Sequence, residues 1–595
     1  MVLKTLTVGK NMPIKQNSYT LKVDKLTDYF DVDDGQREVP VNMTLTAEGF
    51  LAKDFGIDEL SEAFGAEVLW LKVFKQKNGT KHLIFSSGTK VYFWHFTKQK
   101  GYPLPTSQTA ISGTVSVTQG STTVTGSGTD FVTDLVVGQI VVINGEYCEV
   151  TVINNGTNMT VDKAIEQANG TGLTLNKNTD ATYTAGGLFG DVEYDDELFF
   201  GNAIDDYSKF DGVLITKYNT LPKGNVFEVF EDRIFVSGVV AEPLSFYYSD
   251  VGAPTTFDPA SVIKPLGTDF ITGLENYYGT LIIFKSNSIW KMTFVYDQVA
   301  SDFLPKLELM NKNYGCAGFR AYTWVENDIW FFTGLEVRAL GFRDQQTGVL
   351  GLDPSVISNP IKETLKNITN KESSVVFYYQ RQFYLAVSLL GFNDVVFVSH
   401  LLYKNAWTKI KDRKKANVRC FAVDVDTSEV FFSSSLENRI FEWNDEYNDA
   451  GDAISCYVNF KEYEDKDFSQ TNVFRYTDLK FKNLQTIVKV NVWTDDFDAR
   501  SGRSKEFFVG TDIEGEDNAL GEVTVGEHLI ADAFGEEVVA SNFIKRRISH
   551  LVRGTVYQLG LANDILNDSF TIAGFEITGH RRPRRYYSHS KVISI

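Results

Sequence analysis

The chain has 595 residues, with 58 Lys and Arg against 77 Asp and Glu, so its formal charge is 58 − 77 = −19. Hydrophobic residues make up 43% and aromatic residues 13%, which excludes a disordered chain. The acidic balance also excludes a protein that wraps nucleic acid, because phosphate binding depends on cationic side chains that release counterions. The length predicts about three to five domains, or one large repeat domain with attachments.

Cysteine spacing and hydropathy further restrict the class of protein. The four cysteines, Cys148, Cys316, Cys420 and Cys456, stand far apart in the sequence. We therefore expect buried free thiols rather than a disulfide framework or a zinc ribbon. The first ten residues hold no apolar stretch followed by small residues, and no apolar run approaches about 18 residues. These patterns predict a chain made in the cytosol without stable membrane insertion.

Short runs of Val, Ile, Phe, Tyr and Trp, bounded by Gly, Asn and Asp, recur along the whole chain and predict an all-β protein. Residues 69–74, 81–85 and 90–96 are expected to form successive strands. Asn78-Gly79 and Ser87-Gly88 are expected to form the tight turns between them. Only three short helices are expected, at 56–64, 161–167 and 359–367.

Between about residues 181 and 445, strand pairs recur at spacings of roughly 40 to 55 residues, the range of propeller blades. Aromatic side chains of these runs suit the contacts between blades. The pattern favours an irregular β-propeller over a stack of sandwiches without fixing the topology. The expected strands are 197–201, 233–238, 280–284 with 288–290, 328–332 with 336–340, 382–387 with 394–398, and 429–432 with 439–443.

Two other regions differ in texture from these repeats. Residues 112–175 are rich in Thr, poor in charge and alternate apolar with polar positions, which predicts an inserted small β-barrel or sandwich. Residues 455–595 alternate by two, as in a half-buried C-terminal β-sandwich. The predicted segments are 1–110 (N-terminal segment and first propeller strands), 111–178 (inserted β domain), 179–450 (main propeller blades) and 451–595 (C-terminal β domain with a basic tail).

Motifs for catalysis or cofactor binding are missing from the sequence. The seven histidines never fall at i, i+4 spacing or in a His-Glu-x-x-His context, so no zinc site is predicted. Neither a G-x-S-x-G elbow, a Walker loop nor a dinucleotide fingerprint occurs. We therefore expect a protein that is not an enzyme, with no catalytic, cofactor-binding or metal-binding residues and no cofactor.

Carboxylate clusters are the one pattern compatible with catalysis, since paired carboxylates serve glycosidases as acid and nucleophile. The simpler interpretation is that they are solvated residues of turns. The basic stretch Arg581–Arg585, with Tyr586 and Tyr587, is expected to be a solvated tail or to contact an acidic surface of a neighbouring chain. The clusters are Asp31–Asp34, Asp191–Glu197, Asp205-Asp206, and Asp495-Asp496 with Asp498.

The order of several short strings along the chain resembles a known family. It is the β-propeller tail nozzle family of short-tailed bacteriophages, also called tail tubular protein B, with the related tail-stabilisation proteins. The likeness is strongest over about 190–445 and weaker at 41–56 and 455–595. The strings are Asp196–Asn202, Tyr207–Gly212, Glu231–Gly238, Phe246–Pro254, Ile271–Leu274, Gly279–Trp290, Tyr314–Ala317 and Asn327–Gly334.

The resemblance implies a structural virion protein of the phage tail, synthesised in the host cytoplasm. It implies a ring of six copies below the portal and adaptor, to which fibres, spikes or a tip plug attach. Genomic DNA would leave through the lumen without specific binding. Acidic residues on the lumen wall would then repel the DNA and let it slide.

Two other functions stay open at this point. One is a tail hub or receptor-contacting tail-tip protein, within the same class. The other is a propeller glycoside hydrolase, whose candidate carboxylates are Asp195, Asp196, Asp205 and Asp206. Saccharide release that Asp→Asn changes abolish would favour the enzyme, and ring particles would favour the nozzle.

Overall fold

The computed structural model describes most of the chain, which forms two compact units. The propeller unit comprises Ile57–Phe397 and Asp412–Asn444, and the terminal unit comprises the described residues of Met1–Gly56, Val398–Lys411 and Asp445–Ile595. The described residues are 18–23, 39–298, 302–344, 349–350, 354–403, 406–460, 463–464, 470–484, 486–494, 503–510, 544–554 and 556–583.

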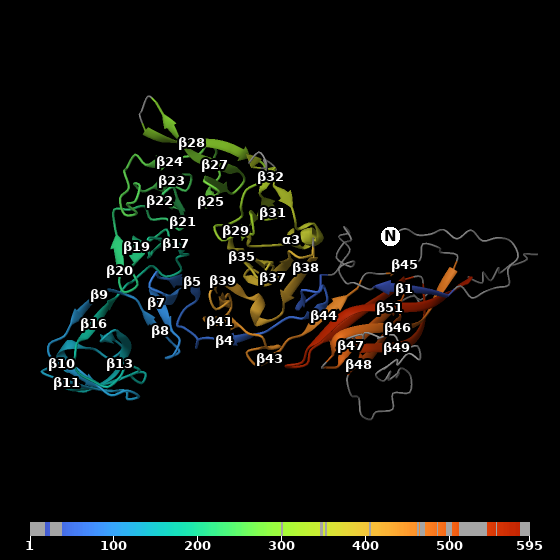
Figure 1. Cartoon of the computed structure of the whole chain (residues 1–595), viewed down its shortest axis with the longest axis horizontal. Helices are drawn as coiled ribbons and strands as arrows, with labels where there is room; N and C mark the ends of the chain where they lie inside the picture. Colours follow the sequence, from blue (N-terminus) through green and yellow to red (C-terminus); the bar gives the residue numbers. More distant parts are fainter. Residues whose placement is uncertain are drawn as a thin grey trace, which may run out of the picture. The chain divides into compact units, whose positions relative to one another are not determined.

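Seven antiparallel sheets, counted over the described residues, make up the propeller (Figure 1). They are named blades 1 to 7 in chain order. Blades 1 to 4 are β5 (Val68–Lys75), β6 (Lys81–Ser87), β7 (Lys90–His95) and β8 (Lys100–Pro103); β17 (Gly190–Tyr194), β18 (Glu197–Gly201), β19 (Tyr207–Phe210) and β20 (Ile215–Tyr218); β21 (Val226–Phe230), β22 (Arg233–Ser237), β23 (Phe246–Tyr248) and β24 (Val262–Ile263); and β25 (Ile271–Tyr277), β26 (Thr280–Lys285), β27 (Ile289–Asp297) and β28 (Asp302–Asn311).

Blades 5 to 7 follow the same up-and-down order. They are β29 (Tyr322–Val325), β30 (Asp328–Phe332), β31 (Val337–Leu340) and β34 (Ser355–Val356); β35 (Val375–Tyr379), β36 (Gln382–Ser388) and β37 (Asn393–His400); and β39 (Val418–Asp424), β40 (Glu429–Ser434), β41 (Ile440–Trp443) and β4 (Ile57–Glu59). The connections hold the hairpin β32 (Phe342–Asp344) and β33 (Val349–Leu350), the 3-10 turns η1 (Asn359–Ile361), η2 (Lys371–Ser373) and η3 (Lys414–Ala416), and α3 (Lys362–Leu365).

The ring is closed by a strand that precedes blade 1 in the sequence. β4 pairs antiparallel with β41 of blade 7, with Ile57 opposite Trp443 and Glu59 opposite Phe441. The Arg439 guanidinium also contacts the Glu59 carboxylate. Because the last sheet takes its fourth strand from the start of the propeller sequence, the segment that leads into blade 1 is held by blade 7.

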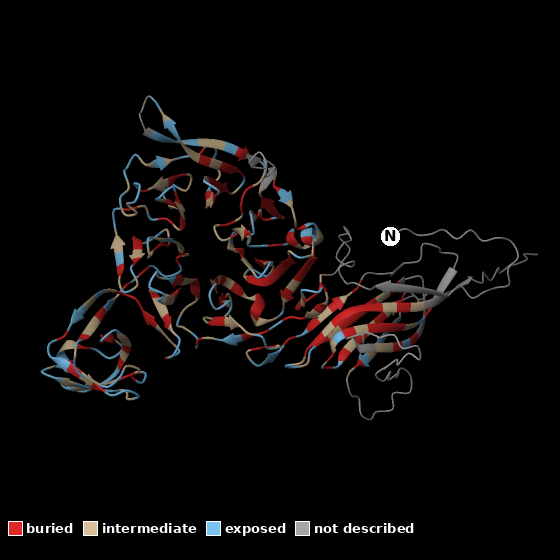
Figure 2. Cartoon of the chain, in the orientation of Figure 1, coloured by how far each residue is buried: buried red, intermediate tan, exposed pale blue. Residues whose placement is uncertain are grey.

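Aromatic and aliphatic side chains fill the space between successive blades, as the sequence predicted. Trp70 of blade 1 stacks on Phe200 of blade 2 at 5.1 Å between ring centroids, and equivalent contacts continue around the ring. Figure 2 shows buried residues throughout the sheets of this unit. The other contacts are Tyr207 with Phe227, Phe230 with Phe294, Phe284 with Phe331, Trp330 with Phe383, Phe377 with Phe421, and the cluster of Leu71 and Phe85 with Phe431.

The sequence predicted the second strands of the blades best because those strands are almost wholly buried. β18, β22, β26, β36 and β40 show nearly continuous burial, which gives the apolar runs seen in the sequence. The expected turns at Gly79 and Gly88 are also confirmed, with φ of 88° and 59°. Other two-residue hairpins use acidic residues, as at Asp195 and Asp196, with φ of 47° and 70°.

The insertion between blades 1 and 2 is a single sheet of eight strands folded around its own core, an open half-barrel. Its order is β15-β10-β11-β14-β13-β12-β16-β9, so the ends of the sheet, β15 and β9, do not pair. Its elements are β9 (Pro105–Ala110), β10 (Thr114–Val117), β11 (Thr123–Ser127), α2 (Phe131–Asp134), β12 (Ile140–Ile143), β13 (Glu146–Asn155), β14 (Asn158–Val161), β15 (Gly170–Leu173) and β16 (Leu175–Asp180).

The terminal unit is a β-sandwich, in agreement with the predicted C-terminal domain. One sheet runs β2 (Met43–Leu45)-β3 (Leu51–Lys53)-β51 (Phe570–Pro583)-β46 (Gln470–Leu484)-β49 (Ile544–Gly554), with β1 (Ser18–Val23) also on β51. The other runs β44 (Cys456–Asn459)-β50 (Val556–Asn563)-β47 (Val488–Thr494)-β48 (Arg503–Val509), with β45 (Tyr463–Glu464) on β50. The unit also holds β38 (Ala406–Lys411), β42 (Asn448–Asp449) and β43 (Asp452–Ala453).

This sandwich takes strands from both ends of the sequence. Phe474 and Phe575 of one sheet share a buried core with Val490 and Leu559 of the other. The buried ammonium group of Lys53, on β3, donates to Asn563 Oδ1 at 3.0 Å. The four segment boundaries drawn from composition stay a prediction, but β1 to β3 group with residues 445–595 rather than with blade 1.

Two of the three predicted helices are wrong. Residues 57–59 form β4, because pairing with β41 outweighs the helical pattern of the local sequence. Val161 ends β14, and the segment 162–167 is irregular. Ile165 enters the core of the insertion, and the backbone N–H groups of Glu166 and Gln167 donate to the Glu146 carboxylate. The helix at 359–367 is confirmed as η1 and α3. In the described ranges no helix is long and apolar enough to span a bilayer.

Buried charges attach the insertion to blade 1. The Lys98 ammonium, in the β7–β8 turn, lies 2.7 Å from the Glu146 carboxylate of β13, and their side chains are 2% and 8% exposed. Lys98 also donates to the Tyr147 carbonyl. Beside it, Lys100 contacts Glu149 at 2.6 Å and Asp162 at 2.8 Å.

The pKa shifts of the two acids follow from these contacts. Burial alone would raise the pKa of Glu146, but the hydrogen bond from Lys98 and those from two backbone N–H groups hold it below its ordinary value. Asp162 is balanced in the same way, with burial opposed chiefly by Lys100. Both carboxylates therefore favour the folded state at neutral pH, and this contribution is lost as the pH falls below the ordinary carboxyl range.

We predict that Lys98→Met destabilises the protein by about 3–5 kcal/mol, because it leaves the Glu146 charge buried without its partner. The matched control is Lys77→Met, which removes a pair with Asp195 whose side chains are 71% and 77% exposed. The control should change stability little, because solvent screens an exposed ion pair. Urea unfolding at pH 7 measures both, and a second change, Glu146→Gln, should recover most of the Lys98→Met loss. Equal costs for the two lysines would contradict the assignment.

Candidate functional site

The carboxylates that the sequence offered for catalysis are held by structural partners. Asp195 contacts Lys77 at 2.8 Å, and Asp196 accepts from the Lys77 backbone N–H. Asp205 accepts from the Thr184 backbone at 2.6 Å and from the Asn202 side-chain amide at 2.7 Å, and Asp206 contacts Lys223 at 2.7 Å. These contacts order turns in and beside blade 2.

The remaining carboxylates of the clusters either have partners on blades 1 and 2 or lie outside the described residues. Asp191 accepts from the Trp70 indole N–H at 2.7 Å and lies 3.1 Å from the Lys72 ammonium, which also contacts Glu193. Glu197 contacts Lys209 at 2.7 Å. Residues 31–34 and 495–498 lie outside the described residues, as do 584–587 of the basic stretch.

His400, His550 and the four cysteines are core residues. Burial lowers the pKa of His400 and His550 to about 4, and each bonds a neighbouring threonine hydroxyl, at 3.2 and 2.9 Å. All four cysteines are free and buried, as predicted. Across the described residues, no group of three or more His, Cys, Asp or Glu side chains has the arrangement of a metal site.

A cavity of about 250 Å³ lies where the first strands of the blades meet at the propeller axis. Arg320, in the turn before β29, extends into this region. Its Nη2 donates to the Leu69 carbonyl of blade 1 at 2.8 Å and to the Phe189 carbonyl beside blade 2 at 2.9 Å. The Arg320 carbonyl accepts from the Val376 N–H of blade 6. One residue of blade 5 therefore ties together three other blades at the axis.

The first strands of blades 3 and 4 bring two carboxyl groups into electrostatic contact. Burial and the neighbouring Glu275 charge raise the pKa of Glu228, and burial raises the pKa of Glu275. Glu275 Oε1 accepts from the Trp324 indole N–H at 2.6 Å, and Glu228 accepts backbone N–H bonds from Val229 and Asn276. Like charges in a poorly hydrated site cannot both ionise cheaply, so this pair retains a proton near neutral pH.

The sequence did not single out Arg320, Glu228 or Glu275. None of the three is directly adjacent to another charged residue or lies in a recognised motif. The only local signal was a charged residue inside an apolar strand or at its start, a pattern that edge and rim positions share. Closure of the propeller places these residues at the first strands of neighbouring blades.

Comparisons with known proteins give little further information about the fold. No family model and no curated protein matches the chain. Solved structures that align with it include Raptor of Chaetomium thermophilum, at 8% identity over 66% of this chain and 29% of that chain, with a TM-score of 0.31. An auxiliary nutrient binding protein from Bacteroides thetaiotaomicron aligns at 9% identity over 54% and 93%, with a TM-score of 0.28. The Pan2 WD40 domain of Neurospora crassa aligns at 10% identity over 57% and 89%, with a TM-score of 0.25. The propeller assignment therefore rests on strand order and ring closure.

We predict that Glu228→Gln flattens the pH dependence of stability. A raised carboxyl pKa means that the folded state keeps a proton that the unfolded state releases above the ordinary value of 4.5. The wild-type protein therefore loses up to about 1.4 kcal/mol per pH unit from this pair as the pH rises above that value. Glu228→Gln should be close to wild type in stability at pH 5.5 and more stable at pH 8.5, as measured by thermal unfolding.

The matched control is Glu242→Gln, which changes an exposed carboxylate in the β22–β23 connection of the same blade. It should keep the wild-type dependence of the melting temperature on pH. If Glu228→Gln and wild type lose stability in parallel between pH 5.5 and pH 8.5, the two carboxyl groups do not share a proton.

Proposed function

We propose that the chain is a structural subunit of a bacteriophage tail that assembles into a ring, the tail nozzle. Six copies would surround a lumen for DNA ejection, dock to the portal-proximal adaptor on one side and carry fibres, spikes or a tip plug on the other. The strings that resemble the nozzle family lie on consecutive blades, from Asp196–Asn202 on blade 2 to Asn327–Gly334 on blade 5. The β-propeller that the resemblance implied is the fold of this region.

The observation that carries the assembly is the long hairpin of β27 and β28 at the outer edge of blade 4. Near its base one face is buried against blade 3 through Phe294 and Leu307. Farther out, Tyr296 and Phe303 form an edge-to-face pair at 5.4 Å and remain 53% and 58% exposed.

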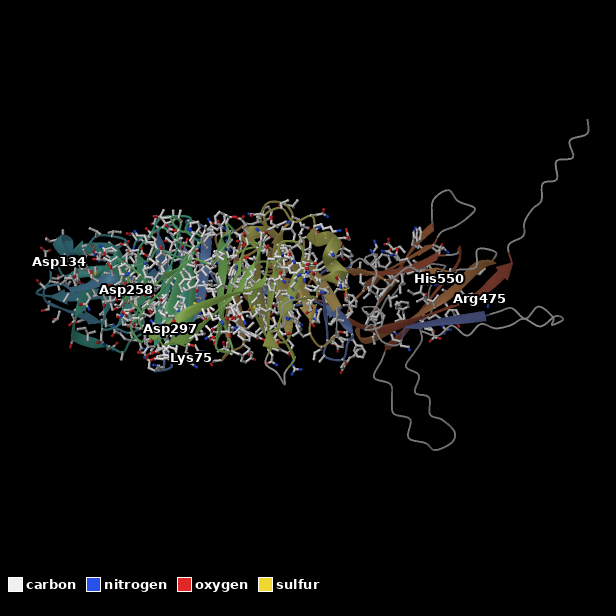
Figure 3. The ribbon with its side chains drawn as sticks, turned by 90° about the horizontal axis from the view of Figure 1, so that it is seen from above. Lys75, Asp134, Asp258, Asp297, Arg475 and His550 are labelled. Carbon is white, nitrogen blue, oxygen red and sulfur yellow. The ribbon has the colours of Figure 1, made fainter. Side chains whose placement is uncertain are left out.

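The opposite face of the same hairpin end is also apolar. There Val295 lies opposite Leu304, and the two are 46% and 42% exposed (Figure 3 labels Asp297, the last residue of β27). A two-stranded ribbon with apolar side chains on both faces gains stability only when another surface covers it. We assign that surface to a second copy of the chain.

A ring built head to tail needs two different surfaces on each copy. The insertion supplies a second apolar surface, around the end of α2, where Val132, Val136 and Val137 are each more than 60% exposed. Asp134 of α2 is labelled in Figure 3, at the end of the insertion away from the blades. Because the insertion leaves the ring between blades 1 and 2 and the hairpin belongs to blade 4, the two surfaces are distinct.

The axis of the propeller cannot be the path for DNA. Arg320 crosses it, and the cavity there holds about 250 Å³. The major groove of duplex DNA alone is about 12 Å wide, so the duplex requires a much larger opening. A lumen would therefore form between copies, and the charge of −19 per chain would keep DNA from adhering to its wall.

We predict that the purified chain forms closed rings visible by electron microscopy, and that Phe303→Asp shifts them to smaller species. A buried aspartate at the hairpin end would cost several kcal/mol per contact, because its charge would be desolvated without a partner. Light scattering measures the mass of the particles, and circular dichroism checks that each variant retains its β structure.

The control is Lys312→Asp, at an exposed position just beyond the base of the same hairpin, which should leave the rings intact. A protein that stays monomeric at high concentration and releases saccharide from host-cell polysaccharide would contradict the proposal. Rings that persist in the Phe303→Asp variant would contradict the role of the hairpin in assembly.

A further inference from the structure

The propeller axis holds a cationic group without a counter-charge. Arg320 is half-buried beside the axial cavity, and only its Nη2 nitrogen has hydrogen-bond partners, the Leu69 and Phe189 carbonyls. No carboxylate in the described part of the chain forms an ion pair with it. Its Nε and Nη1 are not among the buried nitrogens that lack a partner, so their N–H groups reach open space.

The acidic groups nearby form their ion pairs with other cations. Asp191 is bonded by the Trp70 indole and by Lys72, and Arg419 of blade 7 lies 3.2 Å from the Glu67 carboxylate. Burial and the neighbouring Arg419 charge lower the pKa of Arg320 despite the attraction of Asp191. Asp191 and Arg320 are the charged residues that line the cavity, and Asp191 is already held by Trp70 and Lys72, so the Arg320 guanidinium is the group that stays available to a ligand.

The backbone around Arg320 fixes this fork in place. Leu69 lies at a register shift between β5 and β6, where the strand bulges and its carbonyl turns toward the axis rather than into the sheet. The Val376 N–H bond holds the Arg320 backbone from the opposite side. The guanidinium is thus ordered before any ligand arrives, which reduces the entropic cost of binding.

The remaining lining sets the size and chemistry of a ligand. The cavity of about 250 Å³ is smaller than the pockets of drug-sized ligands, about 300–1,000 Å³. Apolar side chains such as Leu71, Val376 and Phe377 share the wall with polar groups, and an electrostatic contact with Arg320 is stronger beside them than in bulk water. Its lining includes Leu71, Asp191, Asn225, Val376, Phe377 and Cys420, from five blades.

We propose that the axial cavity is a binding site for a small oxyanion, inorganic phosphate or a short carboxylate, held by the free N–H groups of Arg320. Arginine suits this role because its planar fork donates two parallel hydrogen bonds to carboxylate or phosphate oxygens. The bound anion would neutralise the axial cation and brace the blades that meet at Arg320. This site lies within one chain and does not depend on the assembly of several copies.

The test is thermal unfolding of the full chain in sodium phosphate, sodium acetate or sodium chloride at equal ionic strength and constant pH. A ligand of the folded state raises the melting temperature progressively with its concentration. We expect phosphate, acetate or both to do so beyond chloride. Phosphate alone identifies inorganic phosphate as the ligand type, and acetate alone identifies a carboxylate.

Three variants make the result specific to Arg320. Arg320→Met should abolish the anion-dependent rise, and Arg320→Lys, which keeps the charge but loses the fork, should weaken the apparent Kd by about tenfold or more. Arg381→Met, at an exposed turn of blade 6, should respond like wild type. If Arg320→Met does not fold, the test rests on Arg320→Lys, whose binding of radiolabelled phosphate is compared with that of wild type by equilibrium dialysis. A wild-type response no larger than that to chloride, or an unchanged response in both Arg320 variants, would overturn the proposal.

Discussion

The propeller depends on one constraint, that seven sheets bury their faces only if the ring closes. Each blade presents large apolar side chains to both neighbours, so an open arc would leave two such faces in water. The three residues of β4 meet this constraint by completing blade 7 with a strand from the start of the propeller sequence. Blade 1 then packs on blade 7 through Leu71, Phe85 and Phe431.

Closure also creates the unusual electrostatics of the molecule. The chain is strongly acidic overall, yet the first strands and their turns gather charges at the axis where water is scarce. Arg320 bonds backbone carbonyls from blades 1 and 2, while Glu228 and Glu275 meet between blades 3 and 4. A narrow axis occupied by such groups is compatible with a rigid structural part and with a small ligand, but not with a channel for a duplex.

The insertion and the terminal sandwich are each held in place or held together by residues that are distant in the sequence. Lys98 and Lys100 of blade 1 clamp three acids of the insertion. The terminal sandwich takes β1 to β3 from one end of the chain and β44 to β51 from the other. The hairpin end of β27 and β28 and the α2 segment take no part in these contacts. They remain exposed apolar surfaces of the propeller unit, available for assembly.

The sequence by itself determined the all-β class, the blade repeat, the insertion and the C-terminal sandwich. It could do so because a buried second strand such as β26 or β36 leaves a continuous apolar run, and a half-buried strand such as β47 leaves strict alternation. The buried free cysteines were also predictable from spacing. The family resemblance and the functions drawn from it remain proposals.

Only the tertiary structure decided which strands share a sheet and which charges share a site. Residues 57–59 became a strand because β41 offered an unpaired edge, and β1 to β3 joined the terminal sandwich across hundreds of residues of chain. The described carboxylates of blade 2 that are clustered in the sequence have cationic or backbone partners, whereas Arg320, Glu228 and Glu275 were inconspicuous in the sequence. The physical reason is that side-chain periodicity reports how far a residue is buried, whereas its partners are set by long-range pairing and ring closure.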